Sequence, residues 1–282
     1  MAGRYTLLDS APDGDSIHFI PDDDTDLARQ APGVKRHPNG GITLRLDGVD
    51  ALETHYLASG GLGVLRQPAP WPDRAALSLL TFLGFSEVRR HSDERIIASQ
   101  PLATRGAIAM RRVDKYGRAV AFVFRGEFRM APSGRFALTP EVVRSSANWH
   151  QLRQGHAYPI FYQDMSPALM ALCSEAACAA RAEGLGFWPE DRTHGGFALT
   201  SLDALKGEAL LLPKLFRRLV DHVGSNGGQL SLATFRAFLE TQVGPVCLWR
   251  EPCSVAFAEL VEVEGAELRL LVAPEDIAFA ED

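Results

Sequence analysis

The sequence predicts an α+β protein in which strands dominate the first part of the chain and helices the second. Short apolar or alternating runs predict strands at residues 17–20, 42–47, 107–112 and 119–124. Longer segments with helical periodicity predict helices at residues 72–85, 141–154 and 167–183. Because these helices do not alternate regularly with the strands, the order favours an α+β fold over a repeated βαβ one.

Each predicted strand has a local justification. The segment 42–47 alternates apolar and polar residues, which places Arg45 on the face opposite the apolar side chains. The runs 107–112 and 119–124 flank residues 114–117, where Asp, Lys, Tyr and Gly predict a tight turn. The sequence therefore predicts a hairpin in the middle of the chain.

The chain divides into two predicted domains. Residues 193–196 (Thr-His-Gly-Gly) are typical of a linker, so we expect a first domain at 1–192 and an α/β accessory region at 193–282. In the accessory region, the patterns predict helices at 202–223 and 231–243 and strands at 254–263 and 267–272. Three segments of the first domain, rich in Asp, Pro, Gly or charge, predict surface insertions: 21–41, 86–104 and 126–140.

Charge is unevenly distributed along the 282 residues. With 29 Lys and Arg against 35 Asp and Glu, the net charge of −6 argues against a surface coated with basic groups for packaging nucleic acid. Residues 86–136 nevertheless hold eleven Lys and Arg against five acids, whereas residues 251–282 hold nine acids against Arg269. Solvated faces would explain both segments, but only the basic one suits a polyanion.

The sequence indicates a cytoplasmic protein that does not contact membranes. The N-terminus lacks the apolar core of a secretory signal, and no stretch approaches the roughly 18 apolar residues of a membrane span. The four cysteines lack disulfide-scaffold or zinc-site spacing, so we expect buried free thiols.

Three polar clusters carry candidate chemistry. The first, Asp13-Gly14-Asp15-Ser16, directly precedes a predicted strand and by itself most often marks only a turn. In the second, Arg45 on a strand is followed by Asp50 and Glu53, and in the third the turn at 114–117 leads into Arg118. Carboxylates suit a hard cation and guanidinium groups suit phosphate oxygens, so together the clusters favour metal-assisted phosphate chemistry.

In this order the clusters resemble the motifs of the staphylococcal nuclease (thermonuclease) family. Segments 13–17 and 44–54 resemble its Asp-Gly-Asp-Thr-Val and Arg-Leu…Asp-Thr-Pro-Glu-Thr motifs, and 114–118 reproduces its Asp-Lys-Tyr-Gly-Arg turn. Downstream, 153–155 (Arg-Gln-Gly) and 184–188 (Gly-Leu-Gly-Phe-Trp) resemble two later family motifs. The resemblance spans roughly residues 5–191, with the three insertions.

The resemblance implies a five-stranded OB-fold barrel with packed helices that hydrolyses DNA or RNA phosphodiesters with Ca²⁺. Asp15 and Asp50 would supply the calcium carboxylates, and Ala51 would add its backbone carbonyl. Glu53 would position or deprotonate the attacking water. The metal would polarise the phosphoryl oxygen and offset the charge that builds up in the transition state.

Four further positions are assigned to substrate by the same resemblance. Arg45 and Arg118 would hold the phosphate and stabilise its transition state, and Lys115 and Tyr116 would flank the nucleotide. Two aromatic residues are weaker candidates for stacking on bases, since core packing is the more usual role: Tyr158 and Phe161.

Two departures from the family pattern bear on activity. Ala51-Leu52 replaces Thr-Pro, and without the proline we expect a looser loop around Glu53. The acidic run at the start of the 21–41 insertion is similar to an EF-hand loop, but Leu27 at position six and Gly33 at position twelve violate that pattern. We therefore expect a solvated loop there, with weak calcium attraction as the alternative.

A competing hypothesis is an OB-fold module that binds nucleic acid or a protein partner without cutting, or a nuclease whose cleft is gated. The insertion at 86–104 or the acidic segment from residue 251 onward would be the gate. The 193–282 region resembles no known pattern; it would dock on the first domain, recruit a partner or form a dimer. The sequence does not choose between DNA and RNA.

Overall fold

The computed structural model describes residues 1–8, 10–92, 94–127, 137–251 and 253–280. They form two compact units, each built from two stretches of chain and each described here by itself. Unit 1 comprises Met1–Val49 and Ala75–Gln151, and unit 2 comprises Asp50–Arg74 and Leu152–Glu281. These units do not follow the expected division at residue 192, because 50–74 and 152–192 belong to the same compact unit as the C-terminal region.

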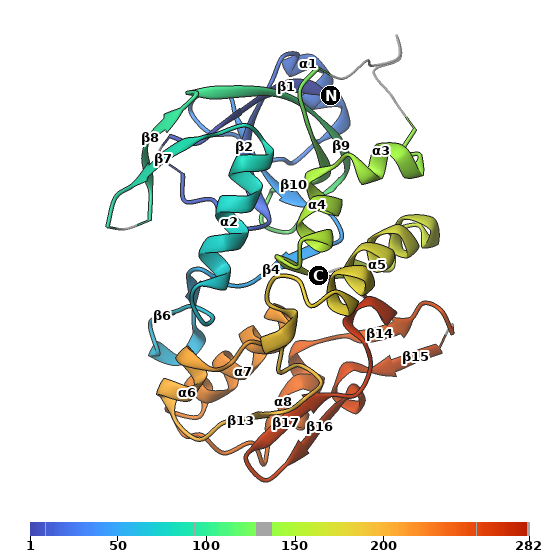
Figure 1. The fold of residues 1–282 in the computed structure, drawn as a ribbon. Helices are drawn as coiled ribbons and strands as arrows, with labels where there is room; N and C mark the ends of the chain where they lie inside the picture. Colours follow the sequence, from blue (N-terminus) through green and yellow to red (C-terminus); the bar gives the residue numbers. More distant parts are fainter. Residues whose placement is uncertain (9, 93, 128–136, 252, 281–282) are drawn as a thin grey trace. The chain divides into compact units, whose positions relative to one another are not determined.

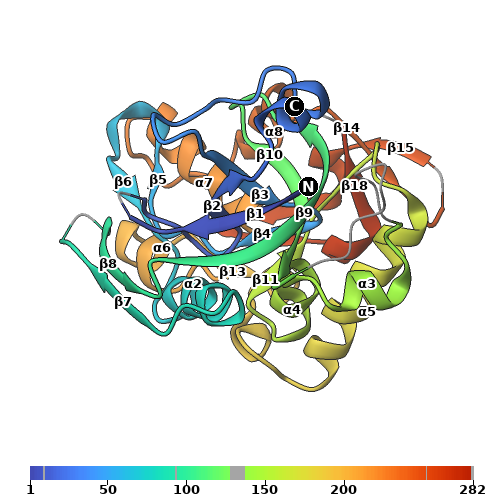
Figure 2. The ribbon, with the colours of Figure 1, turned by 90° about the horizontal axis from the view of Figure 1, so that it is seen from above.

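A closed five-stranded barrel forms the body of unit 1 (Figure 1 and Figure 2). Its strands are β1 (Ala2–Thr6), β2 (Ser16–Pro21), β3 (Ile42–Leu46), β9 (Ala103–Val113) and β10 (Ala119–Arg125). The order around the barrel is β1-β2-β3-β10-β9, with β3 and β10 parallel and all other neighbours antiparallel. The structure thus confirms an α+β fold with a five-stranded barrel.

The barrel is closed around the side chain of Tyr5, which is fully buried. Its hydroxyl donates to the backbone oxygens of Ala107 and Phe124, each at 2.9 Å. A Cβ at Gly106 would lie 2.1 Å from the Tyr5 ring, so this position of β9 accepts only glycine. The phenol therefore links β1 to β9 and β10 through two hydrogen bonds shielded from water.

Helices and a hairpin complete unit 1. The helices are α1 (Asp24–Gln30), α2 (Trp71–Phe82), which begins in unit 2, α3 (Pro140–Arg144) and α4 (Ala147–Arg153), which ends in unit 2. The predicted helix at 141–154 is divided at residues 145–146, where Ser146 forms a β-bridge with Phe124. The 86–104 insertion forms the hairpin β7 (Glu87–Arg90) and β8 (Ile96–Gln100), which extends away from the barrel strands (Figure 1).

The other two predicted insertions have different outcomes. The 21–41 segment is not simply a solvated loop, because it contains α1, whose first turn is capped by the Asp23 carboxylate. The neighbouring acids bind cationic or amide groups: Asp22 accepts two hydrogen bonds from Arg105 at 2.8 Å each, and Asp26 accepts from Gln30 at 2.7 Å. In the 126–140 insertion, residues 128–136 lie outside the described part of the chain.

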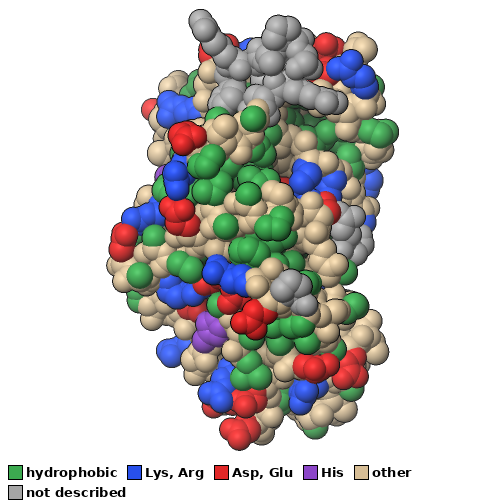
Figure 3. Space-filling view, turned by 90° about the vertical axis from the view of Figure 1, so that its right-hand side faces the viewer, with side chains coloured by type: hydrophobic (Ala, Val, Ile, Leu, Met, Phe, Trp, Pro, Cys, Tyr) green, Lys and Arg blue, Asp and Glu red, His purple; other side chains and the backbone are tan. Residues whose placement is uncertain are grey.

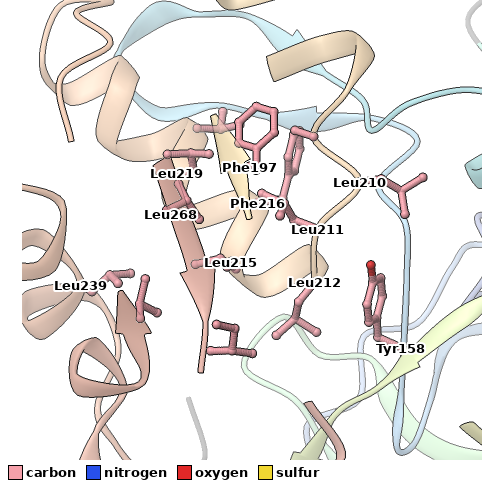
Figure 4. Close-up of a cluster of buried hydrophobic side chains, with 14 of the residues drawn as sticks. Tyr158, Phe197, Leu210, Leu211, Leu212, Leu215, Phe216, Leu219, Leu239 and Leu268 are labelled. Atoms are coloured by element: carbon pink, nitrogen blue, oxygen red, sulfur yellow. The ribbon is translucent and has the colours of Figure 1, made fainter. Parts of the chain in front are cut away.

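Unit 2 is organised around a hydrophobic cluster (Figure 4). Its helices are α5 (Pro167–Ala182), α6 (Leu202–Gly207), α7 (Pro213–Ser225) and α8 (Phe235–Gln242). Its strands are β4 (Val49–Ala51), at whose second residue the unit begins, β5 (Tyr56–Leu57), β6 (Val64–Leu65), β11 (Ala157–Pro159), β12 (Phe161–Tyr162), β13 (Phe197–Ala198), β14 (Pro245–Leu248), β15 (Cys253–Ala256), β16 (Val261–Glu264), β17 (Glu267–Leu270) and β18 (Ile277–Phe279). The buried side chains drawn in Figure 4 come largely from α7 and the segment before it.

Small sheets surround this cluster. β12-β18-β14-β15 form a four-stranded sheet and β13-β17-β16 a three-stranded one, while β11-β4 and β5-β6 are two-stranded. The single helix predicted at 202–223 is divided into α6 and α7, since Pro213 starts a new helix. A 3₁₀ turn likewise divides the strand predicted at 254–263 into β15 and β16.

Two segments of the C-terminal third are integral to unit 2. In the 193–196 segment, Thr193 is fully buried and its hydroxyl accepts a hydrogen bond from the backbone N–H of Leu212 at 2.9 Å. The acidic segment from residue 251 contains β15–β18 and buries Leu268 and Leu270. All four cysteines are free, but only Cys173 is buried.

Within the described residues, no helix has the length and apolar character needed to cross a membrane. Basic side chains do not form one continuous patch on the face drawn in Figure 3, where positive and negative groups are interspersed. The predicted basic segment shows the same pairing in unit 1, through the ion pairs Arg90–Glu94, Arg105–Asp22, Arg111–Asp47 and Arg118–Asp114.

Candidate functional site

Asp15 and Arg45 lie side by side at one end of two paired barrel strands. In the β2–β3 register, Ser16 lies opposite Arg45, which places the residue before β2 next to the same arginine. The Arg45 guanidinium is 3.5 Å from the Asp15 carboxylate, and their side chains are only 13% and 6% exposed. Asp13 fixes the approach to β2 by accepting hydrogen bonds from the Asp15 N–H at 3.2 Å and the Ser16 hydroxyl at 2.7 Å. The structure therefore brings together a predicted metal carboxylate and a predicted phosphate-binding arginine.

Two buried amide side chains that the sequence analysis missed support this strand end. Gln151 donates hydrogen bonds to the backbone oxygens of Gly14 at 2.7 Å and Ala75 at 2.9 Å. Asn148 donates to the backbone oxygen of Asp47 at 2.8 Å and accepts from the N–H of Val123 at 2.9 Å. Both amides are fully buried in α4, so they hold the loops before β2 and after β3 in fixed positions.

Asp47, an acid inside the second motif, has a structural partner. Arg111 of β9 donates two hydrogen bonds to its carboxylate, at 2.7 and 2.9 Å, and the Asp47 side chain is 2% exposed. Paired, two-pronged contacts of this kind are the strongest that a carboxylate makes with a side chain. The carboxylate of Asp47 is thereby used to link the end of β3 to β9.

The predicted hairpin turn between β9 and β10 is present, and Asp114 organises it. Its carboxylate accepts hydrogen bonds from the N–H groups of Tyr116 at 3.0 Å and Arg118 at 2.8 Å, and from the Arg118 Nε at 2.7 Å. Gly117 has φ +84°, a conformation that favours glycine. The Arg118 guanidinium is therefore held beside the turn through its Nε.

Tyr116 is the exposed member of this turn. The residue is 58% exposed, and both the Lys115 ammonium and the Arg118 guanidinium lie 5.3 Å from the centre of its ring. An exposed aromatic face bordered by two cations can stack on a base while the cations attract phosphate. The structure therefore leaves the predicted nucleotide-flanking residues at the surface of unit 1.

In unit 2, Asp50 and Glu53 share one arginine that the sequence analysis did not identify. Arg217 of α7 lies 3.0 Å from Oδ2 and 3.4 Å from Oδ1 of Asp50, and also donates to Oε1 of Glu53. The Asp50 side chain is fully buried, while those of Glu53 and Arg217 are 16% and 18% exposed. Ala51, the third predicted metal ligand, is the last residue of β4 and is 5% exposed. The structure thus brings two of the predicted acids, Asp50 and Glu53, together around one guanidinium.

The loop that carries Glu53 is held by a second missed residue, Gln67. The Gln67 side chain accepts a hydrogen bond from the Glu53 N–H at 3.0 Å and donates to the backbone oxygens of Ala209 at 3.2 Å and Leu211 at 2.8 Å. Gln67 is fully buried. Gln67, which lies two residues after β6, therefore ties this loop to the segment before α7.

Asp221, one turn after Arg217 in α7, contacts the same stretch of chain. Its carboxylate accepts hydrogen bonds from the Tyr56 hydroxyl at 2.7 Å and from the backbone N–H of Ser59 at 3.0 Å. The helical spacing of Arg217 and Asp221 was visible in the sequence. Their partners, which lie 162 to 167 residues earlier in the chain, were not.

The two predicted stacking residues lie in the core of unit 2. Tyr158 stacks on Phe187 with ring centres 4.4 Å apart, and its hydroxyl donates to Asp191 at 2.6 Å. Burial, followed by the negative charge of Asp191, raises the pKa of Tyr158 well above its ordinary value. Phe161 is also fully buried, with its ring edge against Trp249. Neither ring offers a face to a base, so the core-packing alternative describes both.

The two later motifs contact each other in unit 2. A Cβ at Gly186 would lie 1.8 Å from the backbone oxygen of Gly155, and the same oxygen accepts a hydrogen bond from the Phe187 N–H at 3.1 Å. The glycines of both motifs are therefore required by the close approach of two backbone segments.

The predicted calcium ligands are chemically suited to the ion. Asp15 and Asp50 offer carboxylate oxygens and Ala51 a carbonyl oxygen, the hard donors that Ca²⁺ prefers. In the described part of the chain, however, no set of three or more His, Cys, Asp or Glu side chains is arranged to hold a metal ion. The donor set fits the ion in type, and Arg217 supplies the positive charge in the structure as it stands.

No protein-family model matches the chain, and the search of curated proteins gives no match either. The resemblance to the staphylococcal nuclease family therefore remains a prediction from the motifs.

Proposed function

We propose that the chain is a nuclease of the staphylococcal nuclease type, with an OB-fold barrel, that hydrolyses DNA or RNA phosphodiesters with the help of Ca²⁺. The observation that carries the proposal is the juxtaposition of Asp15 and Arg45, 3.5 Å apart and nearly buried at the end of paired strands. A carboxylate beside a guanidinium suits a phosphate whose charge is shared between a metal and an arginine. The strand order β1-β2-β3-β10-β9 fits an OB-fold.

In this proposal the arginines act on the phosphate. Arg45 is placed by its strand and by Asp15, and Arg118 by its Nε contact to Asp114, so each is oriented before substrate arrives. A donor fixed in advance and aimed at developing charge contributes about 3–4 kcal/mol to the transition state. Lys115 and Tyr116 would hold the adjoining nucleotide through charge and stacking.

The carboxylates act on the cation and the water. Asp15 and Asp50, with the Ala51 carbonyl, are the proposed ligands of Ca²⁺, which when bound would offset negative charge on the phosphate. Glu53 is the proposed base or positioning group for water, and Gln67 fixes the backbone N–H of Glu53 at 3.0 Å. No step of this scheme uses Tyr158 or Phe161.

One observation favours a second candidate function, a module that binds nucleic acid or a protein partner without cutting it. Arg217 binds both Asp50 and Glu53, and hydrolysis needs these carboxylates for the cation and the water. A guanidinium that stays in place would leave the arginines and Tyr116 able to bind a polyanion without hydrolysis.

The discriminating experiment is cleavage of labelled single-stranded DNA and RNA by the full chain in Ca²⁺, in Mg²⁺ and in chelator. Glu53→Gln and Arg118→Ala are expected to lose at least a hundredfold in rate, and Arg125→Ala, which removes one charge from the far end of β10, to lose little. Tight binding of the labelled strands without calcium-dependent cutting would refute the nuclease and support the binding module.

A further inference from the structure

The 21–41 segment of unit 1 contacts the hairpin turn between β9 and β10 through Lys35. The Lys35 N–H donates a hydrogen bond to the backbone oxygen of Gly117 at 2.8 Å. A Cβ built at Gly117 would lie 2.5 Å from Cγ and 2.9 Å from Cδ of Lys35, so the aliphatic stem of the lysine packs directly on this glycine. Any larger residue at position 117 would displace that stem. Lys35 therefore contacts the predicted nucleotide-flanking turn through both its backbone and its side chain.

The chain that follows Lys35 is held by its own contacts. Arg36 forms an ion pair with Asp24 of α1. The N–H of His37 donates to a backbone oxygen four residues later at 2.8 Å, and its ring Nε2 lies 2.9 Å from the Thr43 hydroxyl oxygen of β3. The backbone of Lys35 is thus positioned between the turn and the barrel before any ligand arrives.

The charges at the turn favour an anion. Asp114 is the one acid of residues 114–118, and its carboxylate already accepts hydrogen bonds from the Tyr116 N–H and from two N–H groups of Arg118. Lys35 is exposed, and the described part of the chain shows no ion pair for it. Its ammonium lies two bonds beyond the Cδ that contacts Gly117. Lys35 therefore adds a positive charge at the edge of a turn that carries an exposed aromatic ring.

We infer that Lys35 binds a backbone phosphate of a single-stranded nucleic acid whose base stacks on Tyr116, so that the 21–41 segment forms part of the substrate surface. The inference rests on the proposed function and extends it to the part of the strand beyond the nucleotide that is cut. An aromatic ring with a neighbouring positive charge holds a single strand without regard to sequence. Lysine suits the phosphate because its ammonium is a point charge on a flexible stem.

The test is equilibrium binding of a labelled oligothymidylate of about 12 nucleotides, which matches the site size of an OB fold. The full chain is titrated in chelator, which prevents calcium-dependent cutting, and fluorescence anisotropy gives the affinity at several salt concentrations. Lys35→Gln removes the charge but keeps the backbone N–H and most of the stem. An oligouridylate of the same length, used in a parallel titration, distinguishes DNA from RNA as the source of the phosphate.

The expected effect follows from counterion release. Each phosphate contact on a single strand contributes about 0.7 to the slope of log affinity against log salt. Lys35→Gln should therefore lower the slope by about 0.7 and weaken binding about eightfold at about 50 mM salt and about threefold at about 200 mM. Lys35→Arg keeps the charge and should keep the slope. The matched control is Lys206→Gln, the same substitution on an exposed lysine of α6 in unit 2, which should change neither quantity.

Each outcome bears on the inference. A smaller slope in Lys35→Gln that Lys35→Arg restores, on either strand, supports it. An unchanged slope, a loss that Lys35→Arg does not restore, an equal loss in Lys206→Gln, or no binding by the unchanged protein overturns it. If circular dichroism shows that Lys35→Gln is unfolded, Lys35→Met, which keeps the length of the stem without the charge, decides.

The nuclease proposal fails separately. If Lys35→Gln binds the strand more weakly but the unchanged protein does not cut it in Ca²⁺, the phosphate contact stands and the nuclease does not. If the unchanged protein cuts with calcium and Lys35→Gln binds the strand as tightly as before, the nuclease stands and the phosphate contact does not.

Discussion

Replacing Gln67 by alanine should destabilise unit 2 and release the loop that carries Glu53. The side chain is fully buried and makes three hydrogen bonds to backbone groups, at 3.0, 3.2 and 2.8 Å. Each such bond contributes about 0.5–1.5 kcal/mol, and the alanine leaves its partners without a replacement. We therefore expect a loss of about 2–4 kcal/mol in the free energy of unfolding.

The assay is urea and thermal unfolding followed by tryptophan fluorescence, combined with hydrogen–deuterium exchange of the peptide that contains Glu53. At about 2–4 °C per kcal/mol for a unit of this size, the melting temperature should fall by about 5–15 °C. The amide of Glu53 should exchange faster, because it loses its acceptor. Gln242→Ala is the control, since that side chain is exposed and bonds only to the neighbouring Thr241 among the hydrogen bonds described. A loss below 1 kcal/mol with unchanged exchange would refute the assignment of Gln67 as the anchor.

Three further predictions concern other parts of the molecule. Burial, followed by the neighbouring His37, lowers the pKa of His18 from 6.5 to about 4, so the unfolded chain takes up this proton first and stability falls as the pH drops from 7 toward 4. The loss, on the order of 1–2 kcal/mol after allowance for the partly exposed ring, should appear in urea unfolding at pH 7 and 5 and be absent in His18→Asn; an equal loss in that variant would contradict the cause. Asp47→Ala should cost about 3 kcal/mol in the same assay, because Arg111 keeps a partly buried charge without its two-pronged partner, and a cost below 1 kcal/mol would contradict it. Gly224→Ala should lower the melting temperature by several degrees, because the new Cβ would lie 1.9 Å from the backbone oxygen of Ser59, the first residue of the 3₁₀ turn Ser59–Gly61. An unchanged melting temperature would show that this turn can move away without cost.

Local patterns predicted the barrel strands well. Alternation in β3 and the uninterrupted apolar run of β10 both reflect burial of side chains in the barrel, and a five-residue turn with a glycine connects β9 to β10. The first barrel strand, β1, was missed because its Ala, Gly and Arg residues have no apolar signal; its place depends on Tyr5, which is buried by strands about 100 residues away.

The same distinction, between residues placed by local geometry and residues placed by distant contacts, separates the predicted site residues from the missed ones. Asp15, Arg45 and the turn at 114–118 depend on local strand geometry, so the sequence predicted them and the structure brings the first two together. Arg217 and Gln67 depend on contacts separated by 164 and 144 residues, and no local pattern indicates such a partner. The composition at 193–196 is likewise typical of a linker, and no local pattern indicates that Thr193 is buried.

The separation between Asp50 and Arg217 has a consequence for synthesis of the protein. The chain passes into unit 2 at Asp50 and leaves it at Arg74, and the helix that carries the arginine is made 167 residues after the first acid. At about 5–20 residues per second, the acids leave the ribosome roughly 10–30 s before their guanidinium exists. A nascent chain therefore carries both carboxylates before the guanidinium of Arg217 is made. A chain shortened before residue 217 keeps Asp50 and Glu53 and lacks the arginine that contacts both of them in the folded protein.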